Sequence, residues 1–246
     1  MGNTLSKGVR FDGRAFGQVR PITIQRGVIT TAEGSAIATI GDTTVLVANK
    51  FDILKPFADR PDEGVLMTNA ELLPSASARF EPGPPDENSI EMARVVDRAI
   101  RSAECVDLKS FFIETDKVLS LYMDVYVMND AGNYTDAACI AATAALMDTK
   151  VPKVENAKII RGEVDRLLNP SVLPVTTTMV KVGDNWLVDP SRDEERVLET
   201  KLTIGTTDEH VCAMQKAKGS LSKDELLDAI DIAFKTGNDI REILKR

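Results

Sequence analysis

The first part of the chain alternates apolar and polar residues in the way that half-buried strands do. Between 19 and 50, β-branched and small residues recur with glycine punctuation, which predicts several strands. Gly41 and Asp42 separate the apolar runs 37–40 and 43–47, and two turn residues between two such runs predict a hairpin. Segment 64–73 is apolar again, and the stretches 111–114 and 119–128 predict two further strands.

Two segments follow the helical period instead. Segment 89–103 comes after a stiff, proline-rich loop with acidic residues that suit a helix N-terminus. Its predicted apolar face consists of Ile90, Ala93, Val96, Ile100 and Ala103. Segment 136–147 is built largely of small residues, which predicts a helix pressed closely against a sheet, with Asp136 as its N-cap.

The second half of the chain repeats this mixture of elements. Strands are predicted near 175–180, 186–188, 201–206 and 210–214. Ser222 and Glu225 have the spacing of a capping box at the start of a final helix. The order of elements predicts an α+β fold with two similar halves. We expect an N-terminal arm at 1–18, a first half at 19–150, a linker at 151–170 and a second half at 171–246.

Composition supports an ordinary globular protein. The chain has 246 residues, of which 43% are hydrophobic, and its mean hydropathy is −0.11. No apolar run approaches the roughly 20 residues of a membrane span, and the first apolar stretch is too short and too late for a signal peptide. The opening residues match the myristoylation pattern at Gly2 and Ser6, but no polybasic patch follows, so we expect a frayed arm.

Several kinds of chemistry are disfavoured by the residues available. Cys105, Cys139 and Cys212 lack Cys-x-x-Cys spacing, which argues for a reducing cytoplasm and against zinc. His210 is the only histidine, so triad chemistry has no evident base. No glycine-rich dinucleotide or P-loop motif is present, and we expect no cofactor. The net charge of −8 means that RNA or phosphate would need a local basic surface or a basic partner.

Short segments near the start of the chain together resemble the RNase PH family. They are Arg-Phe-Asp-Gly-Arg at 10–14, Val-Arg-Pro-Ile at 19–22, Ala-Glu-Gly-Ser-Ala at 32–36 and Gly-Asp-Thr-Thr-Val-Leu-Val at 41–47. Segments 62–74 and 80–98 narrow the resemblance to the larger, non-catalytic ring subunits of the archaeal exosome. It extends from about Gly8 to the last helix and implies an RNase PH-like fold of two similar β/α halves.

The resemblance also implies an assembly and an activity. Three copies of this subunit type alternate with three copies of a catalytic sister subunit in a hexameric ring, which RNA-binding subunits cap. Such a ring shortens single-stranded RNA from its 3′ end, using inorganic phosphate to release nucleoside diphosphates.

The phosphate-binding turn of active family members is altered in this chain. That turn reads Gly-Thr-Arg or Gly-Ser-Arg before the alanine-rich helix, and the matching positions here are Gly132, Asn133 and Tyr134. A phenol with one donor therefore stands where a guanidinium with five is expected. A shift of the alignment by one residue would place Thr135 there, which is not an arginine either.

The resemblance further implies two aspartates six residues apart, and the matching positions are Asp189 and Glu195. Paired carboxylates could hold Mg²⁺; the alternative, which we favour, is a solvated acidic turn. We expect no catalytic residue and no metal site in this chain.

Three arginines recur along the first predicted helix. Arg94, Arg98 and Arg101 are spaced i, i+4 and i+7, and by spacing alone they form a solvent face paired with Glu91 and Asp97. The resemblance instead assigns RNA contact, near the active site of the sister subunit, to Arg94 and Arg98. Aromatic residues are only 5% of the chain, so RNA contact is expected mainly through phosphates.

Three functional hypotheses follow. The first is a non-catalytic ring subunit that positions RNA for its sister. The second is a divergent phosphorolytic exoribonuclease that acts through Asp189 and Glu195. The third is a scaffold that never contacts RNA.

Overall fold

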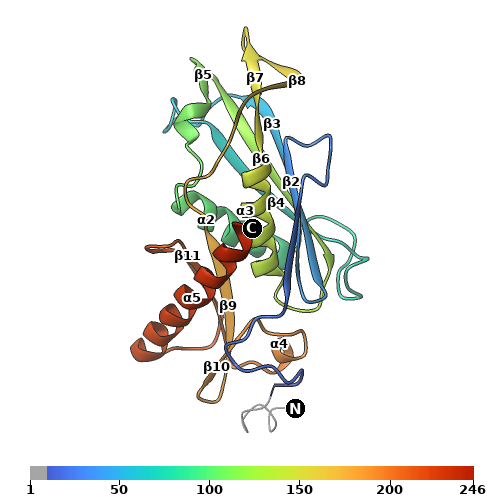
Figure 1. Cartoon of the computed structure of the whole chain (residues 1–246), viewed down its shortest axis with the longest axis vertical. Coiled ribbons are helices and arrows are strands. Elements are labelled where there is room, and N and C mark those ends of the chain that lie inside the picture. The colour runs from blue at the N-terminus through green and yellow to red at the C-terminus, as the bar shows by residue number, and fades with distance from the viewer. Residues whose placement is uncertain (1–9) are drawn as a thin grey trace.

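The structure is a computed structural model in which residues 10–246 are described, and the possible acylation site at Gly2 lies outside this range. It contains two sheets joined by helices, with a small third sheet at one end (Figure 1). Among residues 10–246, no helix combines the length and the apolar character needed to cross a membrane.

The first half is built on a mixed sheet with the strand order β1-β2-β3-β6-β4. Its strands are β1 (Ile22–Arg26), β2 (Gly34–Ile40), β3 (Thr43–Leu54), β4 (Val65–Leu72) and β6 (Lys117–Asn129). A short sixth strand, β5 (Phe112–Glu114), pairs with β6 and directly follows the 3-10 helix η1 (Leu108–Phe111). The pairing is antiparallel except between β4 and β6. The hairpin predicted at Gly41 and Asp42 is confirmed, because Ile40 pairs with Thr43.

Both helices predicted in the first half are confirmed, and each begins two residues earlier than expected. They are α2 (Glu87–Ser102) and α3 (Tyr134–Asp148). The predicted apolar face of α2 was wrong at Ile90, whose side chain is 49% exposed, whereas Met92 and Val95 are buried. The reason is that α2 packs against β4, α3 and β12 of the second half, so its buried face is wider and rotated.

Helix α3 lies between the two halves and is buried on all sides from Asp136 to Leu146. It contacts β2 and β3 on one side and β9 on the other. Gly34 on β2 permits the close approach, since a Cβ there would lie only 2.6 Å from the Cα of Thr149. The expectation that small residues press this helix against a sheet is therefore confirmed. Asp136 is not its N-cap, however, because Asn133 holds that position.

The segment between the halves, expected to be a linker at 151–170, forms a two-stranded sheet for most of its length. Strands β7 (Lys150–Glu155) and β8 (Lys158–Leu167) make a hairpin at the end of the molecule opposite α4 (Figure 1). Most β8 side chains are exposed, so the apolar alternation that identifies a half-buried strand is missing there.

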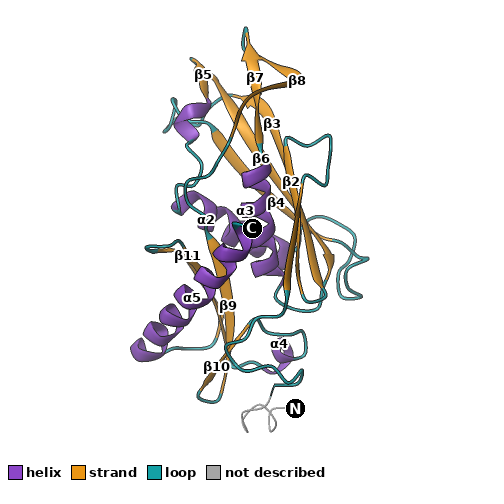
Figure 2. Ribbon diagram, in the orientation of Figure 1, coloured by secondary structure: helices purple, strands orange, loops and turns teal. Residues whose placement is uncertain are grey.

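The second half is an antiparallel sheet with one long helix. The strand order is β10-β9-β11-β12, from β9 (Val175–Val182), β10 (Asn185–Val188), β11 (Thr200–Thr206) and β12 (Val211–Lys218). The short helix α4 (Glu194–Val197) follows β10, and α5 (Lys223–Leu244) ends the chain (Figure 2). The capping box of Ser222 and Glu225 is confirmed.

The largest group of buried apolar side chains spans both halves. It includes Val47, Val125 and Ile140 of the first half together with Val175 and Cys212 of the second. The two halves therefore share a hydrophobic core.

Candidate functional site at the junction of the two halves

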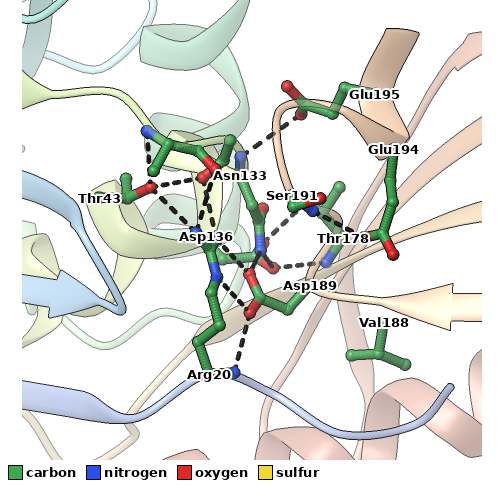
Figure 3. A network of polar contacts seen from close by, with 12 residues as sticks. Arg20, Thr43, Asn133, Asp136, Thr178, Val188, Asp189, Ser191, Glu194 and Glu195 are labelled. Atoms are coloured by element: carbon green, nitrogen blue, oxygen red, sulfur yellow. Dashed lines mark hydrogen bonds and ion pairs between the residues drawn. The ribbon is translucent and has the colours of Figure 1, made fainter. Parts of the chain in front are cut away.

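Asp189 is at the centre of a buried polar network at this junction (Figure 3). It directly follows β10, and only 1% of its surface is exposed. Its carboxylate accepts hydrogen bonds from Arg14 Nη1, from the backbone N, Nε and Nη2 of Arg20, and from Asn133 Nδ2, at 2.7 to 2.9 Å. Burial works to raise the pKa of Asp189, but the hydrogen bonds and charge of Arg20 outweigh it and hold the pKa below its usual value.

These donors surround the carboxylate of Asp189, so it is engaged by protein groups rather than open to a metal ion. Among residues 10–246, no group of three or more His, Cys, Asp or Glu side chains is arranged to hold a metal.

Asp136 joins the first turn of α3 to the second half. Its carboxylate accepts hydrogen bonds from Asn133 Nδ2 at 2.9 Å, from the backbone N of Thr178 at 2.6 Å and from Thr178 Oγ1 at 2.8 Å. Burial raises the pKa of Asp136 to about 6 despite these donors. The residue thus fixes α3 to β9 instead of capping the helix.

The turn that precedes α3 is packed tightly against the second half. Gly132 has φ 96° and Asn133 has φ 56°. A Cβ on Gly132 would lie 2.6 Å from the carbonyl carbon of Ser191, so this close approach requires glycine. Arg20 donates to the carbonyls of Ala131 at 3.1 Å and of Gly132 at 3.0 Å. Arg20 and the close packing against Ser191 thus support the turn in the conformation observed.

Tyr134 is mostly buried, and its ring packs against Phe80. The two rings meet edge to face with 6.2 Å between their centroids, and the guanidinium of Arg79 lies 5.3 Å from the centroid of Phe80. Burial, followed by the negative charge of Glu195, raises the pKa of the Tyr134 phenol above its usual value, so the phenol is neutral. The residue contributes bulk and no positive charge to this position.

Tyr134 and Glu195 lie in one polar hollow of about 290 Å³, which Arg79, Lys201 and Lys218 also line. The carboxylate of Glu195 accepts from Lys201 Nζ at 2.9 Å and from the backbone N of Asn133 at 3.4 Å. Its side chain is only 10% exposed. The expectation of a solvated acidic turn was therefore wrong for Glu195, because Lys201 on β11 pairs with its carboxylate in the folded protein.

The structure brings Asn133, Tyr134, Asp189 and Glu195 together, as the sequence comparison anticipated. Asn133 connects the two carboxylates, since its side chain donates to Asp189 and its backbone N–H to Glu195 (Figure 3). Besides Asn133, each carboxylate has a basic partner of its own, Arg20 for Asp189 and Lys201 for Glu195.

Sequence reasoning missed the cations that organise this site. Arg10 is 2% exposed and binds Glu194 through Nε at 2.9 Å and Nη2 at 2.7 Å, across 184 residues of sequence. It ties residues 10–18 to the second half, so the described part of the predicted arm is not frayed. Arg14, Arg20 and Lys201 were missed as well. Arg10, Arg14 and Arg20 belong to the motifs at 10–14 and 19–22, but nothing in those motifs indicates the partners of these arginines.

Arg94 and Arg98 lie on α2, and neither takes part in the network of hydrogen bonds around Asp189. Arg98 Nη1 is 3.3 Å from the carbonyl of Met214 and 3.4 Å from Gln215 Oε1 on β12. Arg94 is exposed. Within residues 10–246 no carboxylate lies at ion-pair distance from either, whereas Arg101 pairs with Asp97 at 2.9 Å. The salt-bridged face expected from spacing alone is therefore present only at Arg101.

The remaining reactive side chains are in structural positions. The three cysteines are buried and unpaired, and burial raises the pKa of Cys105 to about 12 and of Cys212 to about 11. The Nδ1 of His210 lies 3.1 Å from Thr207 Oγ1 within a turn.

The fold consists of two halves, each a sheet with helices, and the halves share one core. They enclose a buried polar network next to an alanine-rich helix, and this arrangement defines a two-domain protein of the RNase PH type. Residues 18–152 match the model for domain 1 of the 3′ exoribonuclease family, and residues 173–236 match the model for its domain 2. The chain belongs to this family, which confirms both the resemblance and the α+β fold.

Relatives and solved structures agree with this assignment. Exosome complex component Rrp42 of Thermococcus kodakarensis is 48% identical, with 97% of this chain and 90% of that protein covered. An Archaeoglobus fulgidus exosome with RNA bound to the active site contains a chain with a TM-score of 0.89 and 46% identity, covering 98% of this chain and 94% of that one. A chain of an archaeal exosome core gives a TM-score of 0.87 and 44% identity, with 99% of this chain and 95% of that chain covered.

Proposed function

We propose that this chain is a ring subunit of an archaeal exosome and is not catalytic by itself. In this role it supports 3′-to-5′ phosphorolytic RNA degradation by a catalytic RNase PH-type sister subunit, through assembly of a hexameric ring and positioning of single-stranded RNA. RNA-binding cap subunits complete the assembly. The similarity to exosome component Rrp42 extends over 97% of the chain and supports this assignment.

The proposal that this chain is not catalytic by itself is supported by the residues and contacts of the site at the junction of the two halves. Tyr134, a neutral and mostly buried phenol, stands where the family resemblance requires an arginine. Asp189 is surrounded by donors from Arg14, Arg20 and Asn133. Glu195 is paired with Lys201. Phosphorolysis needs a cation to bind phosphate and an available carboxylate, and both carboxylates here are engaged by protein groups.

The RNA-positioning part is supported by Arg94 and Arg98. Within residues 10–246 neither is neutralised by a carboxylate, although the chain as a whole carries a net charge of −8. Contact of Arg98 with β12 orients its guanidinium without satisfying its charge. Two such charges on one helix can bind the phosphates of an RNA 3′ end as it enters the active site of a neighbouring subunit. The three buried cysteine thiols suit a reducing cytoplasm, where we place the protein.

A reconstitution experiment tests the catalytic assignment. The isolated chain, the isolated sister and their mixture are assayed for phosphate-dependent release of ADP from poly(A). We expect no release from this chain and strong release from the mixture. Robust release by this chain alone would overturn the assignment and favour a divergent exoribonuclease.

A double substitution separates RNA positioning from pure scaffolding. Arg94→Glu with Arg98→Glu should slow RNA degradation by the assembled ring, because two attractions for phosphate become two repulsions. Ring assembly, measured by size-exclusion chromatography with light scattering, should be unchanged. Arg101→Gln on the same helix is the matched control and should degrade RNA normally. Wild-type degradation by the double variant would leave only the scaffold role.

A further inference from the structure

Two carboxylates on α2 flank Arg94, but among residues 10–246 neither lies at ion-pair distance from it. Glu91 is three positions before Arg94 and Asp97 three positions after it, a spacing at which opposite charges pair on a helix. Asp97 is bound to Arg101 instead, whose Nη2 and Nε donate to its two oxygens at 2.9 and 3.1 Å. Thr68 Oγ1 on β4 donates to the same carboxylate at 3.3 Å. These contacts explain why Asp97 does not pair with Arg94.

Glu91 has its partner on the second half of the chain. Its Oε1 accepts a hydrogen bond at 3.3 Å from the side-chain Nε2 of Gln215, on β12. Both residues line the polar hollow of about 290 Å³ beside Tyr134. The basic side chains in that hollow are bound elsewhere, Arg79 to Asp130, Lys201 to Glu195 and Lys218 to the carbonyl group of Leu198. A neutral amide, and not a cation, therefore holds Glu91.

The other end of the same amide contacts Arg98. Arg98 Nη1 donates to Gln215 Oε1 at 3.4 Å and to the carbonyl oxygen of Met214 at 3.3 Å. The amide thus has its oxygen toward a cation and its NH₂ group toward a carboxylate, the orientation that both charges favour. Both contacts use Nη1, so within the described part of the chain Nε and Nη2 of Arg98 have no partner. These two nitrogens form an edge of the guanidinium that can bind a phosphate group through two hydrogen bonds.

The neutral amide at position 215 affects how much positive charge α2 presents. A carboxylate there would pair with Arg98 and repel Glu91. An apolar side chain would leave Arg98 without its acceptor and release Glu91, which could then pair with Arg94 at the i, i+3 spacing. Only a side chain with both a donor and an acceptor can make the two contacts without adding a charge.

We propose that Gln215 is a positioning residue for RNA binding, which orients Arg98 without neutralising it and keeps Glu91 away from Arg94. The inference rests on the proposed function, because it takes Arg94 and Arg98 as the residues that bind RNA phosphates. It deepens that function by assigning a role to the second half of the chain. The RNA-binding surface then consists of α2 together with β12, although Gln215 itself acts through the arginines.

RNA binding by the ring assembled with the catalytic sister subunit tests the proposal. A labelled single-stranded oligonucleotide is titrated without inorganic phosphate, so that no phosphorolysis occurs, and log K is measured against log salt. Gln215→Glu should weaken binding about tenfold at low salt, as expected for the loss of a charge-assisted contact. The slope should fall by about 0.7 or more, because at least one phosphate contact is neutralised. In an Arg98→Gln background the same substitution should have a smaller effect, since its ion-pair partner is gone.

A second pair of variants tests the role of Gln215 toward Glu91. Gln215→Met is of similar size but has no amide, so Glu91 should be released to pair with Arg94 and the slope should fall by about 0.7. Glu91→Gln should then restore the slope, and it should raise the affinity more in the Gln215→Met background than in the wild type. This pair tests the proposal by itself if Gln215→Glu prevents ring assembly.

Controls separate positioning from a structural role. Gln25→Glu makes the same substitution at an exposed position of β1 and should leave the affinity and the slope unchanged. Ring assembly is checked by size-exclusion chromatography with light scattering, and folding by thermal unfolding. A purely structural role of Gln215 would lower the melting temperature or impair assembly without changing the salt slope.

The possible failures are distinguishable. A reduced slope for Arg98→Gln together with a wild-type slope for Gln215→Glu would overturn this inference alone. Equal effects of Glu91→Gln in the wild type and in Gln215→Met would also overturn it. A wild-type slope for Arg98→Gln itself would instead remove RNA positioning by Arg98 from the proposed function, and the inference would fall with it.

Discussion

The guanidinium of Arg20 binds both carboxylate oxygens of Asp189, with 2.7 Å from Nη2 to Oδ1 and 2.8 Å from Nε to Oδ2. The two residues are 169 positions apart in the sequence. Arg20 also donates to the carbonyl groups of the turn before α3. This single side chain therefore joins the start of the first sheet, the end of β10 and the candidate site.

Replacement of Asp189 tests how much this contact contributes to the stability of the folded protein. Asp189→Asn should lower the free energy of unfolding by about 3–5 kcal/mol, because it leaves the mostly buried Arg20 without its counterion, whereas Arg14 keeps Asp12 at 2.7 Å. Asparagine tolerates the φ of 51° found here, so backbone strain does not confuse the result. Urea unfolding followed by circular dichroism measures the change. Asp193→Asn in the neighbouring exposed turn is the control and should stay within about 0.5 kcal/mol.

The same contact predicts a pH dependence. The pKa of Asp189 in the folded protein is below the usual value of 3.8. In the window between the two pKa values the unfolded chain binds more protons, so the stability contributed by Asp189 is present above that window and is lost as the pH falls through it. The gap in unfolding midpoint between the wild type and Asp189→Asn should therefore narrow below about pH 4. A gap that stays constant down to full acid unfolding would contradict this.

The contact between β2 and the C-terminal end of α3 predicts a strict requirement for glycine at position 34. A Cβ there would lie 2.6 Å from Thr149 Cα and 2.7 Å from Ala145 O, and neither is a flexible side-chain end. Gly34→Ala should cost about 1–3 kcal/mol or more by pushing α3 off the sheet. Thermal unfolding measures the loss. Gly17→Ala, where no atom lies within 4 Å of the new Cβ, should leave the melting temperature nearly unchanged.

The charges on α2 predict the salt dependence of RNA binding by the assembled ring. If Arg94 and Arg98 each neutralise one phosphate, replacing either by glutamine should reduce the slope of log K against log salt by about 0.7, the value for one contact on a single strand. Fluorescence anisotropy with a labelled oligonucleotide measures the slope. Arg101→Gln should leave it unchanged, since Arg101 is already paired with Asp97. Equal slopes for all variants would exclude phosphate contact by this helix.

Local patterns accounted for most of the elements and for the identity of the site residues. The Gly41 and Asp42 hairpin, the alanine-rich helix and the capping box at Ser222 were predictable because each depends on neighbours within a few positions. The tyrosine at position 134 was also recognisable from the sequence. Its type is a property of the sequence, and aligning it with the family motif needed no coordinates.

Features set by the packing of the two halves were not predictable. Ile90 is exposed because α2 has three packing partners instead of one. The N-cap of α3 is Asn133 and not the predicted Asp136, whose carboxylate instead accepts hydrogen bonds from Thr178 on β9. The β7–β8 hairpin was missed because few of its β8 side chains are buried.

By itself, the sequence determined the α+β class, the family and the absence of an arginine at position 134, since these depend on periodicity and on residue identity. Only the tertiary structure decided the partners of the charges. Arg20 with Asp189, Arg10 with Glu194 and Lys201 with Glu195 become pairs when the sheets and α3 pack together. Burial is what makes these pairs matter, because a charge removed from water must find its counterion in the folded protein.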